Sequence, residues 1–139
     1  MSYLLDTNVL SEPRKPAPDA HVLSWLARVD ASELFVSVLS IGEIRKGVER
    51  LRRRGDRRQA NVLEQWLEQL KADFAGRFLP VTVRVAERWG MLNAASVRPP
   101  AVDGLLAATA IENDLTFVTR EHGALESTGV ALLDPWQAT

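Results

Sequence analysis

The 139-residue chain has no cysteine and almost no net charge, and both features narrow what it can do. Without cysteine it forms no disulfide, uses no thiolate as a nucleophile and binds no metal through sulfur. The lack of disulfides suits a reducing cytosol, so we expect a cytoplasmic protein. Its 17 Lys+Arg and 18 Asp+Glu give a formal net charge of −1. Contact with nucleic acid therefore requires a local basic patch rather than a long-range field.

The sequence also lacks a long apolar run. No stretch approaches the roughly 20 residues that cross a bilayer, and the N-terminus has no basic start and apolar core typical of a signal peptide. The two histidines, His21 and His122, are too few and too far apart for a histidine metal site. We expect an intracellular protein without a membrane segment, with residues 1–139 forming a single domain.

Short apolar segments alternate with amphipathic ones along the chain. The predicted strands are residues 3–5, 33–39, 78–81, 115–119 and 129–133, all rich in branched or aromatic side chains. Apolar residues at helical spacing lie between them, and two of the predicted helices form a hairpin around residues 54–56. This alternation is typical of an α/β fold, with a central parallel sheet of four to five strands flanked by helices.

Three acidic residues share a context that composition does not require. Asp6 follows the first predicted strand, Glu43 falls in the first turn of a helix predicted to open at Ser40, and Asp103 begins the helix after a diproline. The carboxyl ends of parallel strands meet at one edge of a sheet, so these acids can converge there. Converging carboxylates repel one another unless a cation intervenes, and Mg²⁺ prefers oxygen ligands. Such an ion can activate water for attack on a phosphodiester.

Each acid also has a structural explanation. Ser40 and Glu43 have the spacing of a capping box, in which the glutamate bonds back to the cap residue. Asp103 would complement the helix dipole, and Asp6 could serve a turn. From the residues alone, a metal site and ordinary capping both remain open.

Five stretches, in order, resemble PIN-domain nucleases, in particular the VapC-type toxins of their FitB-like branch. They are residues 4–12 (LLDTNVLSE), 40–47 (SIGEIRKG), 99–110 (PPAVDGLLAATA), 115–120 (LTFVTR), and Gly129-Val130 with Asp134-Pro135-Trp136. The resemblance spans nearly the whole chain, and it implies a PIN-like fold.

The resemblance implies a Mg²⁺- or Mn²⁺-dependent endoribonuclease, the toxin of a type II toxin–antitoxin pair. The family's first three acidic positions, which bind metal and catalyse, fall on Asp6, Glu43 and Asp103. Its polar position at the end of the fourth strand falls on Thr119. Thr7 and Asn8 accompany the first acid and are expected to orient it.

The resemblance also implies partners. Such toxins pair with a small VapB-type antitoxin, whose C-terminal segment fills the groove and presents a basic side chain to the acids. They dimerise through helices and form larger assemblies that bind operator DNA through the antitoxin. We therefore expect a homodimer, an RNA substrate and an antitoxin partner.

The chain departs from the family pattern after Thr119. Relatives usually continue with Asn-x-x-Asp-Phe, and that aspartate completes an acidic quartet. Here Ala124 takes the aspartate position, and Glu121, at the asparagine position, is the predicted substitute acid. Gly104 is a second departure, because a larger helix former usually follows the third acid.

A basic cluster between Arg45 and Arg58 follows Glu43, with eight cations against two acids. It could track an RNA backbone, since phosphate contacts give sequence-independent affinity, or it could be the solvated face of a helical hairpin. The residues predicted to contact RNA are Arg14, Lys15, Arg45 and Lys46.

Two other functions remain open. The missing fourth aspartate is compatible with a weakly active or inactive PIN-fold module that only binds a partner. A phosphoryl-transfer domain with Asp6 as nucleophile is disfavoured, because Asn8 stands where a second aspartate is expected and the last lysine is Lys71.

Overall fold

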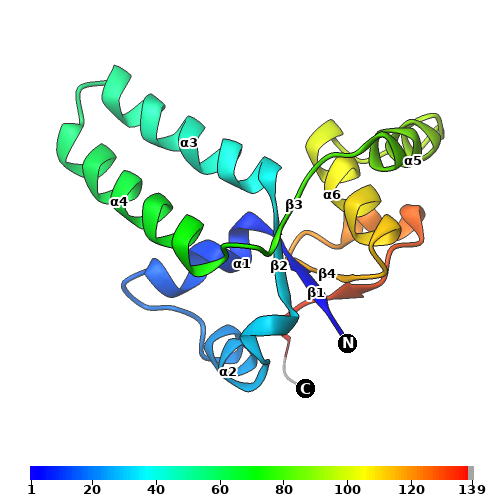
Figure 1. The fold of residues 1–139 in the computed structure, drawn as a ribbon, viewed down its shortest axis with the longest axis horizontal. Coiled ribbons are helices and arrows are strands. Elements are labelled where there is room, and N and C mark those ends of the chain that lie inside the picture. The colour runs from blue at the N-terminus through cyan, green and yellow to red at the C-terminus, as the bar shows by residue number, and fades with distance from the viewer. Residues whose placement is uncertain (138–139) are drawn as a thin grey trace.

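The computed structural model describes residues 1–137 and contains a five-stranded sheet (Figure 1). The strands are β1 (Tyr3–Leu5), β2 (Leu34–Ser37), β3 (Phe78–Leu79), β4 (Thr116–Val118) and β5 (Leu132–Leu133). Their order across the sheet is β3-β2-β1-β4-β5, and every pair is parallel. The predicted α/β fold with a central parallel sheet is confirmed, with five strands.

Helices cover the sheet on both faces. They are α1 (Thr7–Ser11), α2 (Ala20–Arg28), α3 (Val38–Arg53), α4 (Arg57–Asp73), α5 (Val83–Asn93) and α6 (Ala101–Glu112), with 3₁₀ turns η1 (Glu12–Arg14), η2 (Ala31–Glu33) and η3 (Gly123–Thr128). In Figure 1 the α3–α4 hairpin extends away from the sheet on one side, and α5 and α6 lie on the other. Within residues 1–137, no helix has both the length and the apolar character needed to cross a membrane.

The strand side chains alternate between two apolar cores. Leu5 and Val118 pack with the core under α1, α2 and the base of the hairpin. Leu4 and Phe117 pack with the core under α6. Because successive strand residues point to opposite faces, these short strands are buried on both sides, as parallel strands require.

The start of α3 differs from the prediction. The predicted strand 33–39 ends at Ser37, and the Ser37 hydroxyl caps α3 by accepting from the Leu39 amide at 3.0 Å. The predicted first-turn position of Glu43 is therefore wrong, because Glu43 lies in the second turn, and the alternative explanation of Ser40 and Glu43 as a capping box is excluded. The apolar pair Val38-Leu39 extends the strand pattern by two residues, which hides the true boundary.

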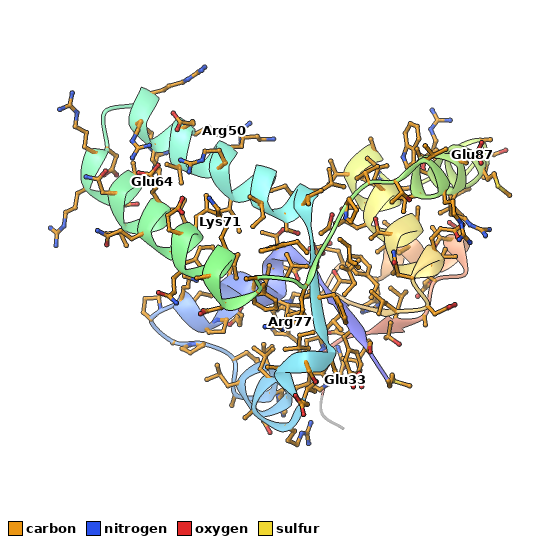
Figure 2. All side chains as sticks on the ribbon, viewed as in Figure 1. Glu33, Arg50, Glu64, Lys71, Arg77 and Glu87 are labelled. Atoms are coloured by element: carbon orange, nitrogen blue, oxygen red, sulfur yellow. The ribbon has the colours of Figure 1, made fainter. Side chains whose placement is uncertain are left out.

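Ion pairs join the two helices of the hairpin. Arg45 and Arg52 of α3 both bind the Glu64 carboxylate of α4, which lies between the helices in Figure 2. These two guanidinium groups lower the pKa of Glu64 from its usual 4.5 to about 2. These ion pairs hold α3 and α4 together. Glu43 lies on α3 near the end of the hairpin that joins the sheet.

Candidate metal centre

The centre of the site lies where β1 and β4 end side by side. Leu5 pairs with Val118 in the sheet, so the next residues, Asp6 and Thr119, meet at its carboxyl edge. The Thr119 hydroxyl donates to Asp6 Oδ2 at 2.7 Å, and the Thr7 amide donates to Oδ1 at 2.7 Å. Asp6 and Thr119 are both buried. These bonds hold the first carboxylate in one orientation.

Glu43 reaches the same edge from α3. Its Oε1 accepts a hydrogen bond from the Thr7 hydroxyl at 3.0 Å. Thr7 therefore contacts both carboxylates, through its amide on Asp6 and through its hydroxyl on Glu43. This bond links residues 36 positions apart and has no signal in the local sequence.

Asp103 lies in the first turn of α6, half-buried, as the sequence predicted. The next residue, Gly104, packs closely against α5. A Cβ at this position would lie 2.7 Å from Asn93 Oδ1 and 3.1 Å from the Trp89 ring. The glycine that departs from the family pattern therefore lets α5 and α6 approach at the residue that follows the third acid.

The region of the missing fourth acid lies after β4. Ala124 is exposed in η3 and offers no ligand atom. Glu121 is exposed, its amide donates to the Thr119 hydroxyl oxygen at 3.0 Å, and its charge is felt at Asp103. Glu121 is thus close to the acids, and its predicted role as the substitute acid stays a prediction.

Carboxylates of like charge act on one another at this edge. Burial raises the pKa of Asp6, hydrogen bonds from Thr119 and Thr7 lower it, and the charges of Glu43 and Asp103 raise it, with a net upward shift. Burial also raises the pKa of Asp103, and the charge of Glu121 adds to that effect. The carboxylates are therefore near enough to destabilise one another's ionised forms.

This donor set fits a hard divalent cation. It consists of carboxylate oxygens whose mutual repulsion a cation would relieve, and Mg²⁺ or Mn²⁺ favours such ligands. As the side chains stand, no group of three acidic or histidine residues within residues 1–137 is arranged to hold a metal ion. Mg²⁺ commonly takes only one or two carboxylates and completes its shell with water, so a complete protein cage is not required. The predicted ligand set, Asp6, Glu43 and Asp103, stays a prediction.

Asn8 lies beside this cluster. Its side-chain amide is 3.5 Å from the Thr119 hydroxyl oxygen, a long hydrogen bond, and its own Oδ1 is buried without a partner among the described residues. A buried acceptor without a donor is costly. Asn8 therefore has an unused oxygen next to the hydroxyl that holds Asp6.

Three of the four predicted RNA-contacting residues are engaged within the chain. The Arg14 guanidinium stacks 4.5 Å from the centre of the Trp66 ring, Lys15 pairs with the buried Glu12 at 2.9 Å, and Arg45 binds Glu64. Lys46 is exposed and pairs with no acidic side chain of residues 1–137. Their contact with RNA stays a prediction.

The sequence and the fold are both similar to those of known proteins. A family model described as PIN domain matches residues 3–128. The chain is 36% identical to toxin FitB of Neisseria gonorrhoeae, over 96% of this chain and 97% of that protein. It is 31% identical to VapC ribonuclease Y4jK of Sinorhizobium fredii, over 96% and 97%. A solved structure of FitAB bound to an IR36 DNA fragment superposes with a TM-score of 0.88 at 34% identity, covering 99% of this chain and 97% of that one.

Proposed function

Because this chain belongs to the PIN-domain family, we propose that it is the ribonuclease toxin of a type II toxin–antitoxin pair and that residues 1–139 form one PIN-like domain. The relatives named toxin and ribonuclease cover nearly its whole length. The observation that carries the proposal is the cluster of carboxylates at the carboxyl edge of the sheet, where Thr7 hydrogen-bonds to both Asp6 and Glu43 and the charge of Asp103 reaches Asp6. Such a cluster fits metal-assisted hydrolysis of RNA phosphodiester bonds.

In this proposal Asp6, Glu43 and Asp103 hold Mg²⁺ or Mn²⁺. When bound, the ion would lower the pKa of a water and stabilise charge on the phosphate. The Thr119 hydroxyl keeps Asp6 oriented, and Thr7 ties Asp6 to Glu43. Burial of Asp6 and Thr119 excludes bulk water from their hydrogen bond, so the first ligand keeps its geometry.

The proposal includes protein partners. The structural relative FitAB is a complex bound to DNA. We propose that this chain likewise forms a homodimer, binds a VapB-type antitoxin, and reaches DNA only through that antitoxin. A cytoplasmic location agrees with an RNA substrate.

A second candidate function is a partner-binding module with little catalysis. Exposed Ala124 at the fourth acidic position favours it, because one carboxylate of the family pattern is missing. The two candidates differ in one property, the hydrolysis of RNA in the presence of a divalent ion.

Cleavage of purified total RNA with Mg²⁺ or Mn²⁺ tests this proposal. Wild type should cut, and Asp6→Asn should lose more than about a hundredfold in rate, because even residues that support a metal ligand are worth 10–100-fold. The matched control is Asp114→Asn, at the opposite edge of the sheet. Asp114 has φ 54°, a conformation that asparagine adopts readily, so its activity should stay at the wild-type level.

Two results would contradict the proposal. Absence of cleavage by wild type would favour the partner-binding module, and full activity of Asp6→Asn would exclude the carboxylate site. Glu121→Gln addresses the fourth acid separately: a normal rate would show that Glu121 is not the substitute.

A further inference from the structure

The basic residues of helix α3 lie on two opposite faces of the helix. At about 100° per residue, Lys46, Arg50 and Arg53 lie about 60°, 20° and 80° from Glu43 around the helix axis. Arg45 and Arg52 lie about 160° and 180° away, on the opposite face. The stripe of Lys46, Arg50 and Arg53 therefore shares its face with Glu43.

The two faces differ in pairing. Arg45 and Arg52 are half-buried and bound to Glu64 of α4. Lys46, Arg50 and Arg53 are exposed, and none pairs with an acidic side chain of residues 1–137. Figure 2 labels Glu64 between the helices and Arg50 on α3. Hairpin stability thus accounts for the paired arginines and leaves the stripe unexplained.

The stripe begins one turn beyond Glu43. From Glu43 to Arg53 the helix rises about 15 Å, at about 1.5 Å per residue. A stacked strand carries one phosphate for about every 3.4 Å of helix axis, so this length can run beside more than one phosphate. A row of cations that pair with no acid of residues 1–137 and that starts at an acidic site complements a polyanion that enters or leaves that site. No aromatic side chain belongs to the stripe, so it would contact the backbone rather than stack on bases.

We propose that Lys46, Arg50 and Arg53 form a track for the phosphate backbone of single-stranded RNA on one side of the carboxylate site. This inference rests on the proposed ribonuclease function and adds the path of the substrate. Arg45, bound to Glu64 on the other face, does not belong to the track. The track fixes no sequence preference, because phosphate contacts carry no base information.

The test uses the double variant Lys46→Gln/Arg50→Gln. Its control, Lys71→Gln/Arg28→Gln, removes one exposed lysine and one exposed arginine that lie outside α3 and outside the Arg45–Arg58 cluster. Binding of a fluorescein-labelled 12-nucleotide oligouridylate is measured by anisotropy in EDTA over a range of salt. The track variant should bind at least about tenfold more weakly at low salt, and its salt slope should fall by about 1.4, since each single-strand phosphate contact contributes about 0.7. The control should stay within about twofold of wild type.

Three binding results would overturn the track: no binding by wild type, equal losses in both variants, or wild-type affinity in the track variant. A duplex DNA of the same length is the second probe. Loss of DNA binding with unchanged RNA binding would also overturn the proposal and assign the stripe to DNA.

An RNA-cleavage assay distinguishes failure of the track from failure of the proposed ribonuclease function. The track variant should raise KM for RNA and leave the single-turnover rate at saturating RNA unchanged. If wild type cleaves and the track variant has an unchanged KM, the track is wrong and the ribonuclease stands. If wild type binds through the stripe but does not cleave with Mg²⁺ or Mn²⁺, the ribonuclease function fails instead.

Discussion

The α3–α4 hairpin and the carboxyl edge of the sheet both hold carboxylates, but the surroundings shift the pKa values of these carboxylates in opposite directions. In the hairpin, Glu64 lies between two arginines, and its pKa falls to about 2. At the sheet edge, burial raises the pKa values of Asp6 and Asp103, and the charges of neighbouring acids add to this rise. In the hairpin, Glu64 pairs with groups of opposite charge, whereas at the edge the acids act on one another. Clustered carboxylates whose pKa values are raised by burial and by one another are typical of a functional site.

Among changes that leave every acid in place, removal of the hydroxyl that holds Asp6 is expected to give the largest effect on the edge. Thr119→Val keeps the side-chain shape and deletes the 2.7 Å bond to Asp6 Oδ2. RNA cleavage should fall by about 10–100-fold, as for other groups that orient a metal ligand.

Thr116→Val is the matched control, a threonine-to-valine change at the other end of β4. Its cleavage rate should equal that of wild type. A Thr119→Val enzyme with full activity would show that the orientation of Asp6 does not limit catalysis.

A smaller effect is expected in the pH dependence of stability, where the two regions should differ in sign. The pKa of Glu64 is lower in the folded than in the unfolded chain, so its contribution is present above about pH 4.5 and is lost as the pH falls toward 2. Glu64→Gln should therefore be less stable than wild type at pH 7, and the difference should shrink below pH 4.5. High salt should also reduce it, because the pairs are partly exposed.

Asp103→Asn should behave in the opposite way in the metal-free protein. A raised carboxyl pKa means that the ionised group destabilises the fold above its ordinary pKa, and protonation relieves this cost. The variant should be more stable than wild type at pH 7, and the two should converge in acid. Thermal unfolding between pH 7 and 3 measures both variants. If both variants changed the melting temperature at pH 7 in the same direction, the contrast between the hairpin and the sheet edge would be wrong.

Local patterns predicted much of the fold and part of the site. The alternation of apolar and amphipathic segments was sufficient for the parallel sheet, and the position of Asp6 after β1 was sufficient to place it at the edge. The start of α3 was missed because Val38 and Leu39 fit a buried strand as well as a helix, and only the Ser37 cap decides between them.

Contacts between distant residues could not be predicted from local patterns. The Thr7–Glu43 bond and the packing of Gly104 against Trp89 and Asn93 depend on how whole elements meet. Local context singled out the three acids and the resemblance to a family assigned them a role, but neither could show which basic residues are already paired. Arg45 differs from Lys46 because it forms an ion pair with Glu64, and that pair depends on the position of α4 beside α3.

The central claim is that the acids at the sheet edge require a divalent cation, and a metal titration of thermal stability tests it most directly. Mn²⁺ or Mg²⁺ at a hundredfold excess over its Kd should stabilise wild type by about 2.7 kcal/mol. Asp103→Asn should start from a higher melting temperature and gain far less from the ion. An unchanged melting temperature of wild type, or an equal gain in Asp103→Asn, would contradict the account.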